Sequence, residues 1–224
     1  MSQDIIHVYF MPGMAASSLI FEHIKLPEDS FQMHYLEWLV PKKNETLQDY
    51  AKRTAASITH ENVVLAGVSF GGVLVQEMSK FVSTRKVLVI SSVKSRGELP
   101  NRMKLAKFTN AYKLIPTKKL SNIDVLAKYA FGKVANDRIE LYRKYLLVND
   151  PYYLEWAIKQ LMFWKPQDIQ ANIVHIHGDK DKVFPTYHLK NFIPVKGGSH
   201  IMIINKYKWF NENLAKIILD EKLA

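Results

Sequence analysis

A serine set between two glycines is the residue of this sequence most suited to chemistry. Gly67-Val68-Ser69-Phe70-Gly71 has the form G-x-S-x-G. In a sharp turn of this kind the serine hydroxyl is pushed out above the sheet edge, and side chains at the two glycine positions would collide. A helix that begins after Ser69 would direct its amide dipoles at a developing negative charge. The pattern predicts a nucleophilic serine. The alternative is a glycine-rich turn that only makes a corner or binds a phosphate.

The residues on either side of the turn favour the catalytic interpretation. Val63 to Ala66 are apolar and partly β-branched, which is typical of a short buried strand. Residues 73–82 have apolar side chains at spacings of three and four, which predicts a helix. Strand, glycine turn and helix together form the context in which G-x-S-x-G indicates a nucleophile elbow.

A second glycine-containing loop could present backbone N–H groups to a ligand. Residues 5–10 predict a buried strand, and Pro12-Gly13 directly after it is a turn signal. Gly13 would let backbone amides lie open toward a ligand, and the next residue, Met14, has a free N–H. We therefore expect this loop to face the same sheet edge as Ser69.

The remaining core elements continue the alternation of strands and helices. We expect further strands at 31–40, 86–92, 171–177 and 191–195, and helices at 19–24, 46–58 (capped by Asn44 or Thr46) and 202–219. This alternation predicts an α/β fold with a mostly parallel sheet covered by helices on both faces.

The alternation stops near residue 95. From there to about residue 165 the sequence predicts helices, interrupted by four prolines and carrying eleven aromatic residues. We interpret residues 1–95 and 170–224 as one core domain, and residues 96–169 as an all-helical lid inserted over one edge of the sheet. Most of the aromatic residues would serve helix packing, and some would line the cavity that the lid covers.

Composition excludes several functional classes. The chain has 224 residues, no cysteine and a net charge of +10. Disulfides, thiolate metal sites and a cysteine nucleophile are therefore excluded. We see no signal peptide and no apolar run of about 20 residues, so a cytoplasmic protein without stable membrane insertion is expected. Between residues 94 and 170, 15 Lys and Arg face 7 Asp and Glu. This excess could attract an anionic substrate, but no nucleic-acid motif accompanies it and an ordinary solvated surface is the commoner explanation.

Four segments, in chain order, resemble the α/β-hydrolase superfamily. The G-x-S-x-G segment is similar to the nucleophile elbow, and residues 10–14 to the oxyanion loop, with Pro12 where the family often has His. Residues 177–185 resemble the loop that holds the triad carboxylate, and residues 197–200 the loop that holds the triad histidine. Because the chain begins at the strand before the oxyanion loop, we expect a compact sheet of about six strands.

The resemblance implies a serine hydrolase of the carboxylesterase or thioesterase kind (EC 3.1). Ser69 would be the nucleophile, His200 the base and Asp181 the carboxylate, while the amides of Met14 and Phe70 would form the oxyanion hole. Asp179 is a rival for Asp181, and His7, His175 and His177 are expected to be structural. No cofactor or metal is implied, and the partner would be a small ester or thioester. The same triad could instead cleave a carbon–carbon bond or act as a lyase, and the fold could also serve as a non-catalytic ligand-binding protein.

Overall fold

The computed structural model describes residues 5–114, 143–166 and 172–220. Within these ranges, no helix is both long enough and apolar enough to cross a membrane. Six strands form one sheet in the order β2-β1-β3-β4-β5-β6, and every neighbouring pair is parallel. The strands are β1 (Ile6–Met11), β2 (Phe31–Tyr35), β3 (Val63–Val68), β4 (Thr84–Ile90), β5 (Ile173–Gly178) and β6 (Ile193–Val195). The predicted α/β fold with about six strands is confirmed.

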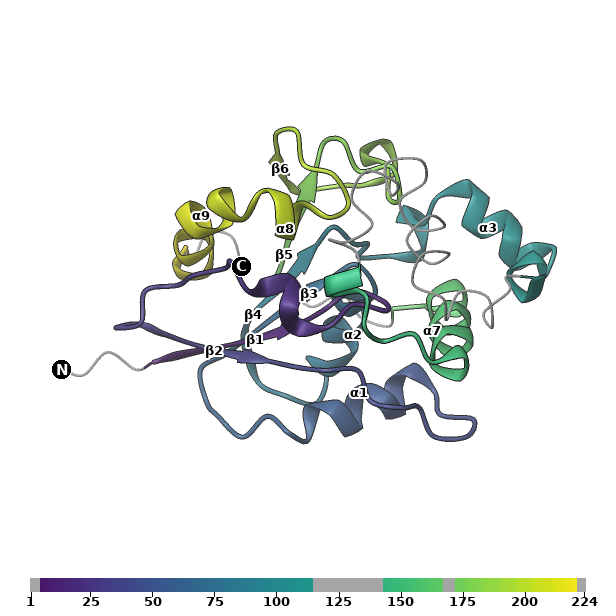
Figure 1. Ribbon diagram of the computed structural model, residues 1–224, viewed down its shortest axis with the longest axis horizontal. Coiled ribbons are helices and arrows are strands. Elements are labelled where there is room, and N and C mark those ends of the chain that lie inside the picture. The colour runs from purple at the N-terminus through teal and green to yellow at the C-terminus, as the bar shows by residue number, and fades with distance from the viewer. Residues whose placement is uncertain (1–4, 115–142, 167–171, 221–224) are drawn as a thin grey trace.

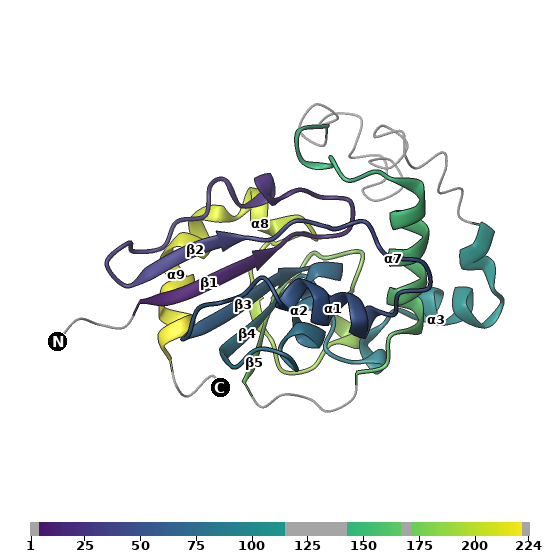
Figure 2. The same ribbon diagram turned by 90° about the horizontal axis from the view of Figure 1, so that it is seen from below.

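Helices cover both faces of this sheet. Figure 2 shows α1 (Leu47–Ala55) and α2 (Phe70–Met78) on one face, with α8 (Met202–Asn205) and α9 (Tyr207–Leu219) on the other. Beyond the carboxyl ends of the strands lie α3 (Asn101–Phe108) and α7 (Pro151–Phe163) (Figure 1). Short 3-10 turns occupy Ser18–Phe21, Arg96–Glu98, Ala111–Leu114 and Thr186–His188.

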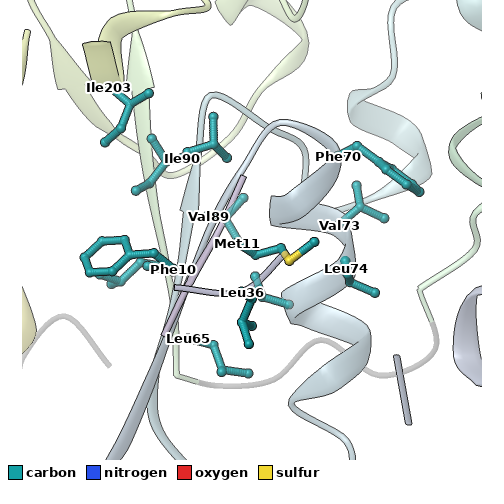
Figure 3. Packing of buried hydrophobic residues seen from close by; sticks show 14 of the residues in the cluster. Phe10, Met11, Leu36, Leu65, Phe70, Val73, Leu74, Val89, Ile90 and Ile203 are labelled. Atoms are coloured by element: carbon teal, nitrogen blue, oxygen red, sulfur yellow. The ribbon is translucent and has the colours of Figure 1, made fainter. Parts of the chain in front are cut away.

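The core encloses β3 and α2, the two elements that flank Ser69. All six residues of β3 and all nine of α2 are buried. A strand that is buried on both faces reads as a continuous apolar run, which is why Val63 to Ala66 showed no alternation. Figure 3 shows side chains from β1, β3, β4 and α2 that form part of this core. The turn between β3 and α2 is therefore held by two rigid elements.

Most predicted elements have limits within three residues of those in the structure, and four elements differ more. Residues 36–40 do not extend β2. Leu36 still donates a hydrogen bond to the Phe10 carbonyl, but β1 ends at Met11, so residues 37–40 have no β1 partner. Helix α2 starts at Phe70 and ends at Met78, not at 73 and 82. The helix expected at 202–219 is broken at Lys206, where φ is −118° and ψ is 23°. The segment at 19–24 is a 3-10 turn instead of an α-helix.

The proposed lid is described only in part. Its described residues include α3 and α7, while residues 115–142 and 167–169 lie outside the described ranges. Helix α7 rests against the core: Trp156 Nε1 donates a 2.7 Å hydrogen bond to the Glu45 carbonyl, and Trp164 Nε1 one of 2.8 Å to the Glu77 carboxylate. The division into a core domain and a lid stays a prediction.

Candidate active site

The turn at Ser69 has the strained geometry that the glycine spacing predicted. Ser69 adopts φ 53° and ψ −120°, a region that residues other than glycine rarely occupy. A Cβ at Gly67 would lie 2.3 Å from the Gly71 carbonyl oxygen, and one at Gly71 would lie 2.3 Å from the carbonyl oxygen of Pro12. Both positions therefore require glycine for steric reasons. The turn is further fixed by Ser92, whose Oγ donates to the Ser69 carbonyl over 2.5 Å.

A continuous hydrogen-bond chain connects Ser69, His200 and Asp181. Ser69 Oγ lies 3.0 Å from His200 Nε2, and His200 Nδ1 lies 2.9 Å from Asp181 Oδ2. A carboxylate can only accept, so Nδ1 carries the imidazole proton and Nε2 is free to accept the proton of the serine hydroxyl. The residues come from three loops after β3, β5 and β6, at the sheet edge where open α/β folds place their sites.

The environment of Asp181 keeps this carboxyl ionised. Its side chain is fully buried, and Oδ1 accepts hydrogen bonds from the amides of Val183 (2.7 Å) and Phe184 (3.0 Å). Burial alone raises the pKa of the Asp181 carboxyl, but the charge on His200 and the hydrogen bonds from His177, His200 and Phe184 outweigh it. The pKa of Asp181 is therefore held well below its usual range.

The rival carboxylate, Asp179, lies outside this chain. Asp179 is exposed, and its Oδ1 accepts a 2.7 Å hydrogen bond from the amide of Gly197. That contact fixes the loop that precedes His200. The structure thus gives the two aspartates different surroundings, although they are two residues apart.

The two predicted oxyanion donors belong to segments that adjoin Ser69. Phe70 is the first residue of α2, and Gly13 packs on the serine, since a Cβ there would be 3.5 Å from the Ser69 Cβ. Among the described residues, no backbone acceptor pairs with the amides of Met14 or Phe70. Backbone pairing among the described residues therefore leaves both amides unused, and their role as oxyanion donors stays a prediction.

Trp38 is a residue of the site that sequence reasoning missed. Its indole Nε1 donates a 2.9 Å hydrogen bond to the carbonyl of Gly13, and its ring stacks on Phe70 with centroids 5.2 Å apart and planes 9° apart. The Gly13–Met14 peptide is trans, so turning the carbonyl toward Trp38 turns the Met14 N–H the opposite way. Trp38 therefore contacts both segments that carry the predicted donors. No motif or spacing distinguishes it in the sequence.

Two buried histidines, His175 and His177, form a hydrogen-bonded pair next to Asp181. His177 Nε2 lies 2.9 Å from the Phe184 carbonyl and 3.3 Å from Asp181 Oδ2, so this nitrogen carries a proton. Its Nδ1 then accepts from His175 Nε2, 3.2 Å away. Both side chains are buried, as expected of structural residues, but His177 also contacts the carboxylate that holds His200.

Comparisons with known proteins identify the fold of the chain. No protein-family model matches the sequence. No curated protein matches it either. The chain has the α/β-hydrolase fold, which solved structures share over nearly their whole length. A bromoperoxidase from Bacillus anthracis has a TM-score of 0.69 and 16% identity, covering 97% of this chain and 93% of its own.

Two further neighbours are named as hydrolytic enzymes. A structure from a study of carboxylesterases of the thaumarchaeon Nitrososphaera gargenis has a TM-score of 0.69 and 13% identity, covering 96% of this chain and 90% of its own. The RedJ thioesterase of prodiginine biosynthesis in Streptomyces coelicolor has a TM-score of 0.63 and 12% identity, with coverages of 94% and 89%. At these identities the likeness establishes the fold.

Proposed function

We propose that the protein is a serine hydrolase that cleaves a small carboxylic ester or thioester through an acyl-enzyme. The observation that carries this proposal is the chain from Ser69 Oγ through His200 to Asp181, with links of 3.0 and 2.9 Å. A binding protein with no catalytic role has no need of a strained serine and an oriented imidazole. Solved esterase and thioesterase structures of the same fold give further support.

In the first half-reaction, Ser69 Oγ attacks the carbonyl carbon while His200 Nε2 takes the hydroxyl proton. The resulting oxyanion accepts hydrogen bonds from the amides of Met14 and Phe70. Asp181 holds the Nδ1 tautomer and stabilises the imidazolium. The carbon–oxygen or carbon–sulfur bond then breaks, and the leaving group takes the proton from His200. Water attacks the acyl-enzyme by the same steps and releases the acid.

Substrate charge is a finer part of the proposal. The excess of Lys and Arg in residues 94–170 would favour an anionic acyl group or a leaving group that bears phosphate. Attraction to exposed cations weakens as salt rises, so KM should increase with ionic strength for an anionic substrate and stay constant for a neutral one. An equal KM response for both substrates would contradict this part.

An activity-based probe tests the central claim. We expect a fluorophosphonate to add once per molecule, on the peptide that contains Ser69, and Ser69→Ala and His200→Ala to remain unlabelled. Ser18→Ala and His23→Ala, which change the same residue types away from the site, should label like the wild type. A folded wild-type protein that resists both this probe and a smaller sulfonyl fluoride would refute the proposal and favour a ligand-binding protein.

A substrate screen separates the remaining enzymatic alternative. Turnover of p-nitrophenyl esters or acyl thioesters, lost in Ser69→Ala, supports the proposed reaction. Activity confined to diketones or keto acids would instead assign carbon–carbon bond cleavage or elimination to the same three residues.

A further inference from the structure

Three histidines far apart in the sequence meet at a second place in the fold. His7 lies in β1, His34 in β2 and His60 in the loop between α1 and β3. One ring nitrogen of each lies within 4.8 Å of the others, and His7 Nδ1 is 3.0 Å from His34 Nε2. Nitrogen ligands about 2.0–2.1 Å from a tetrahedral zinc ion would be a little over 3 Å apart. The His7–His34 pair is therefore close to the spacing of zinc ligands, and a ring nitrogen of His60 completes a group within 4.8 Å.

This histidine cluster (His7, His34 and His60) is separate from Ser69. His7 pairs with Val63 at the start of β3, whereas Ser69 follows the last residue of that strand. The strands run parallel, so the two groups lie toward opposite ends of β3. A ligand bound by the cluster would not touch the catalytic residues.

Tyr9 is a neighbour of the cluster outside the three imidazole rings. Its hydroxyl is 2.5 Å from His60 Nδ1, and its ring stacks on His34 with centroids 4.4 Å apart. Such a partner commonly fixes the tautomer of a ligating histidine.

We propose that His7, His34 and His60 bind a divalent transition-metal cation of the zinc type. Three imidazole nitrogens suit Zn²⁺, Co²⁺ or Ni²⁺, and offer nothing to Mg²⁺ or Ca²⁺, which prefer oxygen. Water would complete four-fold coordination. The sequence predicted no metal site. His34 comes 27 positions after His7, and His60 comes 26 positions after His34, so no local ligand spacing is present.

One side chain has to move for the ion to bind. The His60 ring now stacks on His7, with centroids 3.9 Å apart and planes 12° apart, and parallel rings cannot both point at one ion. His60 is exposed on a loop, so its rotation requires no repacking of the core. His60 and Thr59 line an open cavity of about 730 Å³, which leaves space for the His60 side chain to move. Once bound, the ion would tie the edge strand β2 and this loop to β1.

Zinc and cobalt binding test the proposal directly. Untagged protein, freed of metal with a chelator, is titrated with ZnCl₂ by calorimetry and with CoCl₂ by visible absorption. We expect one equivalent of each ion, a tetrahedral Co²⁺ spectrum, and a Tm that rises by about 4 °C or more at saturating Zn²⁺. His34→Gln and His60→Gln should each weaken Zn²⁺ binding at least about tenfold, since each removes one of three ligands.

Three control variants distinguish this site from other histidines. His23→Gln and His188→Gln, both outside the cluster, should bind one Zn²⁺ as the wild type does. His200→Gln should also bind it, which excludes capture of the ion beside Asp181. His60→Gln changes an exposed residue, so its circular dichroism should remain that of the folded protein. Binding that survives in His34→Gln and His60→Gln, or is absent in the wild type, would overturn the proposal and leave only a hydrogen-bonded cluster.

Discussion

Replacing Trp38 by phenylalanine tests whether the indole hydrogen bond sets the oxyanion hole. The substitution removes the Nε1–H that donates to the Gly13 carbonyl over 2.9 Å, while it leaves an aromatic ring against Phe70. The Gly13 carbonyl keeps a second donor, the Ala16 amide at 3.0 Å. The peptide that carries the Met14 N–H would therefore lose one of two restraints on its orientation.

The expected loss in kcat follows from the loss of one of the two hydrogen bonds to the Gly13 carbonyl. Removing one oxyanion donor outright typically costs about 10²–10³ in rate. Loosening one of two restraints should cost less, so we expect kcat to fall by about 10- to 100-fold, or about 1.4–2.7 kcal/mol of transition-state stabilisation. KM should change by less than about threefold, because the ground-state carbonyl carries little charge. The free energy of unfolding should fall by about 2 kcal/mol, from the lost hydrogen bond and the space left by the larger ring.

The assay is steady-state hydrolysis of the best ester from the screen, with the fluorophosphonate labelling rate as a second readout. Trp164→Phe is the matched control. Trp164 is also buried (4% exposed, against 8% for Trp38), and its indole donates over 2.8 Å to Glu77. This control should lose similar stability but keep its kcat. An unchanged kcat in Trp38→Phe, or an equal fall in Trp164→Phe, would refute the reasoning.

Three further predictions follow from buried contacts of the described residues. Asp181→Asn should lower kcat about 10³–10⁴-fold in steady-state assays, because the amide favours the wrong tautomer of His200. Asp179→Asn should change kcat by less than about tenfold, and equal losses in the two variants would reject the assignment of Asp181. Burial, and then the charges of neighbouring cations, lower the pKa of His175 to about 3, so below pH 6.5 the unfolded state binds a proton that the folded state excludes. The free energy of unfolding should then fall by about 1.4 kcal/mol per pH unit as the pH drops toward 3. Between pH 5.5 and 4.0, urea unfolding should show a fall about 2 kcal/mol larger in the wild type than in His175→Gln. Equal falls in the two proteins would contradict the role of the His175 pKa. Gly67→Ala should destabilise the fold by more than about 3 kcal/mol in urea unfolding, because its Cβ would overlap the backbone of the turn, while Gly97→Ala, with its nearest contact at 3.5 Å, should stay within about 1 kcal/mol; a stable Gly67→Ala would show that the turn can relax.

Local patterns in the sequence were sufficient to predict the fold. Apolar runs such as Val63 to Ala66, alternating with periodic segments, indicated a parallel sheet, and the structure confirms six parallel strands. Asn44 and Thr46 were the two predicted N-caps of α1. The structure selects Thr46, whose side chain accepts a hydrogen bond from the Asp49 amide. The predicted end of β2 was wrong because it depends on a partner strand: residues 37–40 continue a strand-like composition, but β1 ends at Met11 and does not reach them.

The clash that requires Gly67 is local, because it involves Gly71 and Gly72, so this part of the strained turn at Ser69 follows from the sequence. The clash at Gly71 involves the backbone of Met11 and Pro12 and therefore depends on the tertiary structure. The resemblance favoured Asp181 and left Asp179 as a rival, and the tertiary structure brings Asp181 to His200 and Asp179 to Gly197. The tertiary structure also decided the contact of Trp38 with Gly13 and the meeting of the three histidines. Distances between residues far apart in the chain depend on strand order and register, which short-range periodicity does not encode.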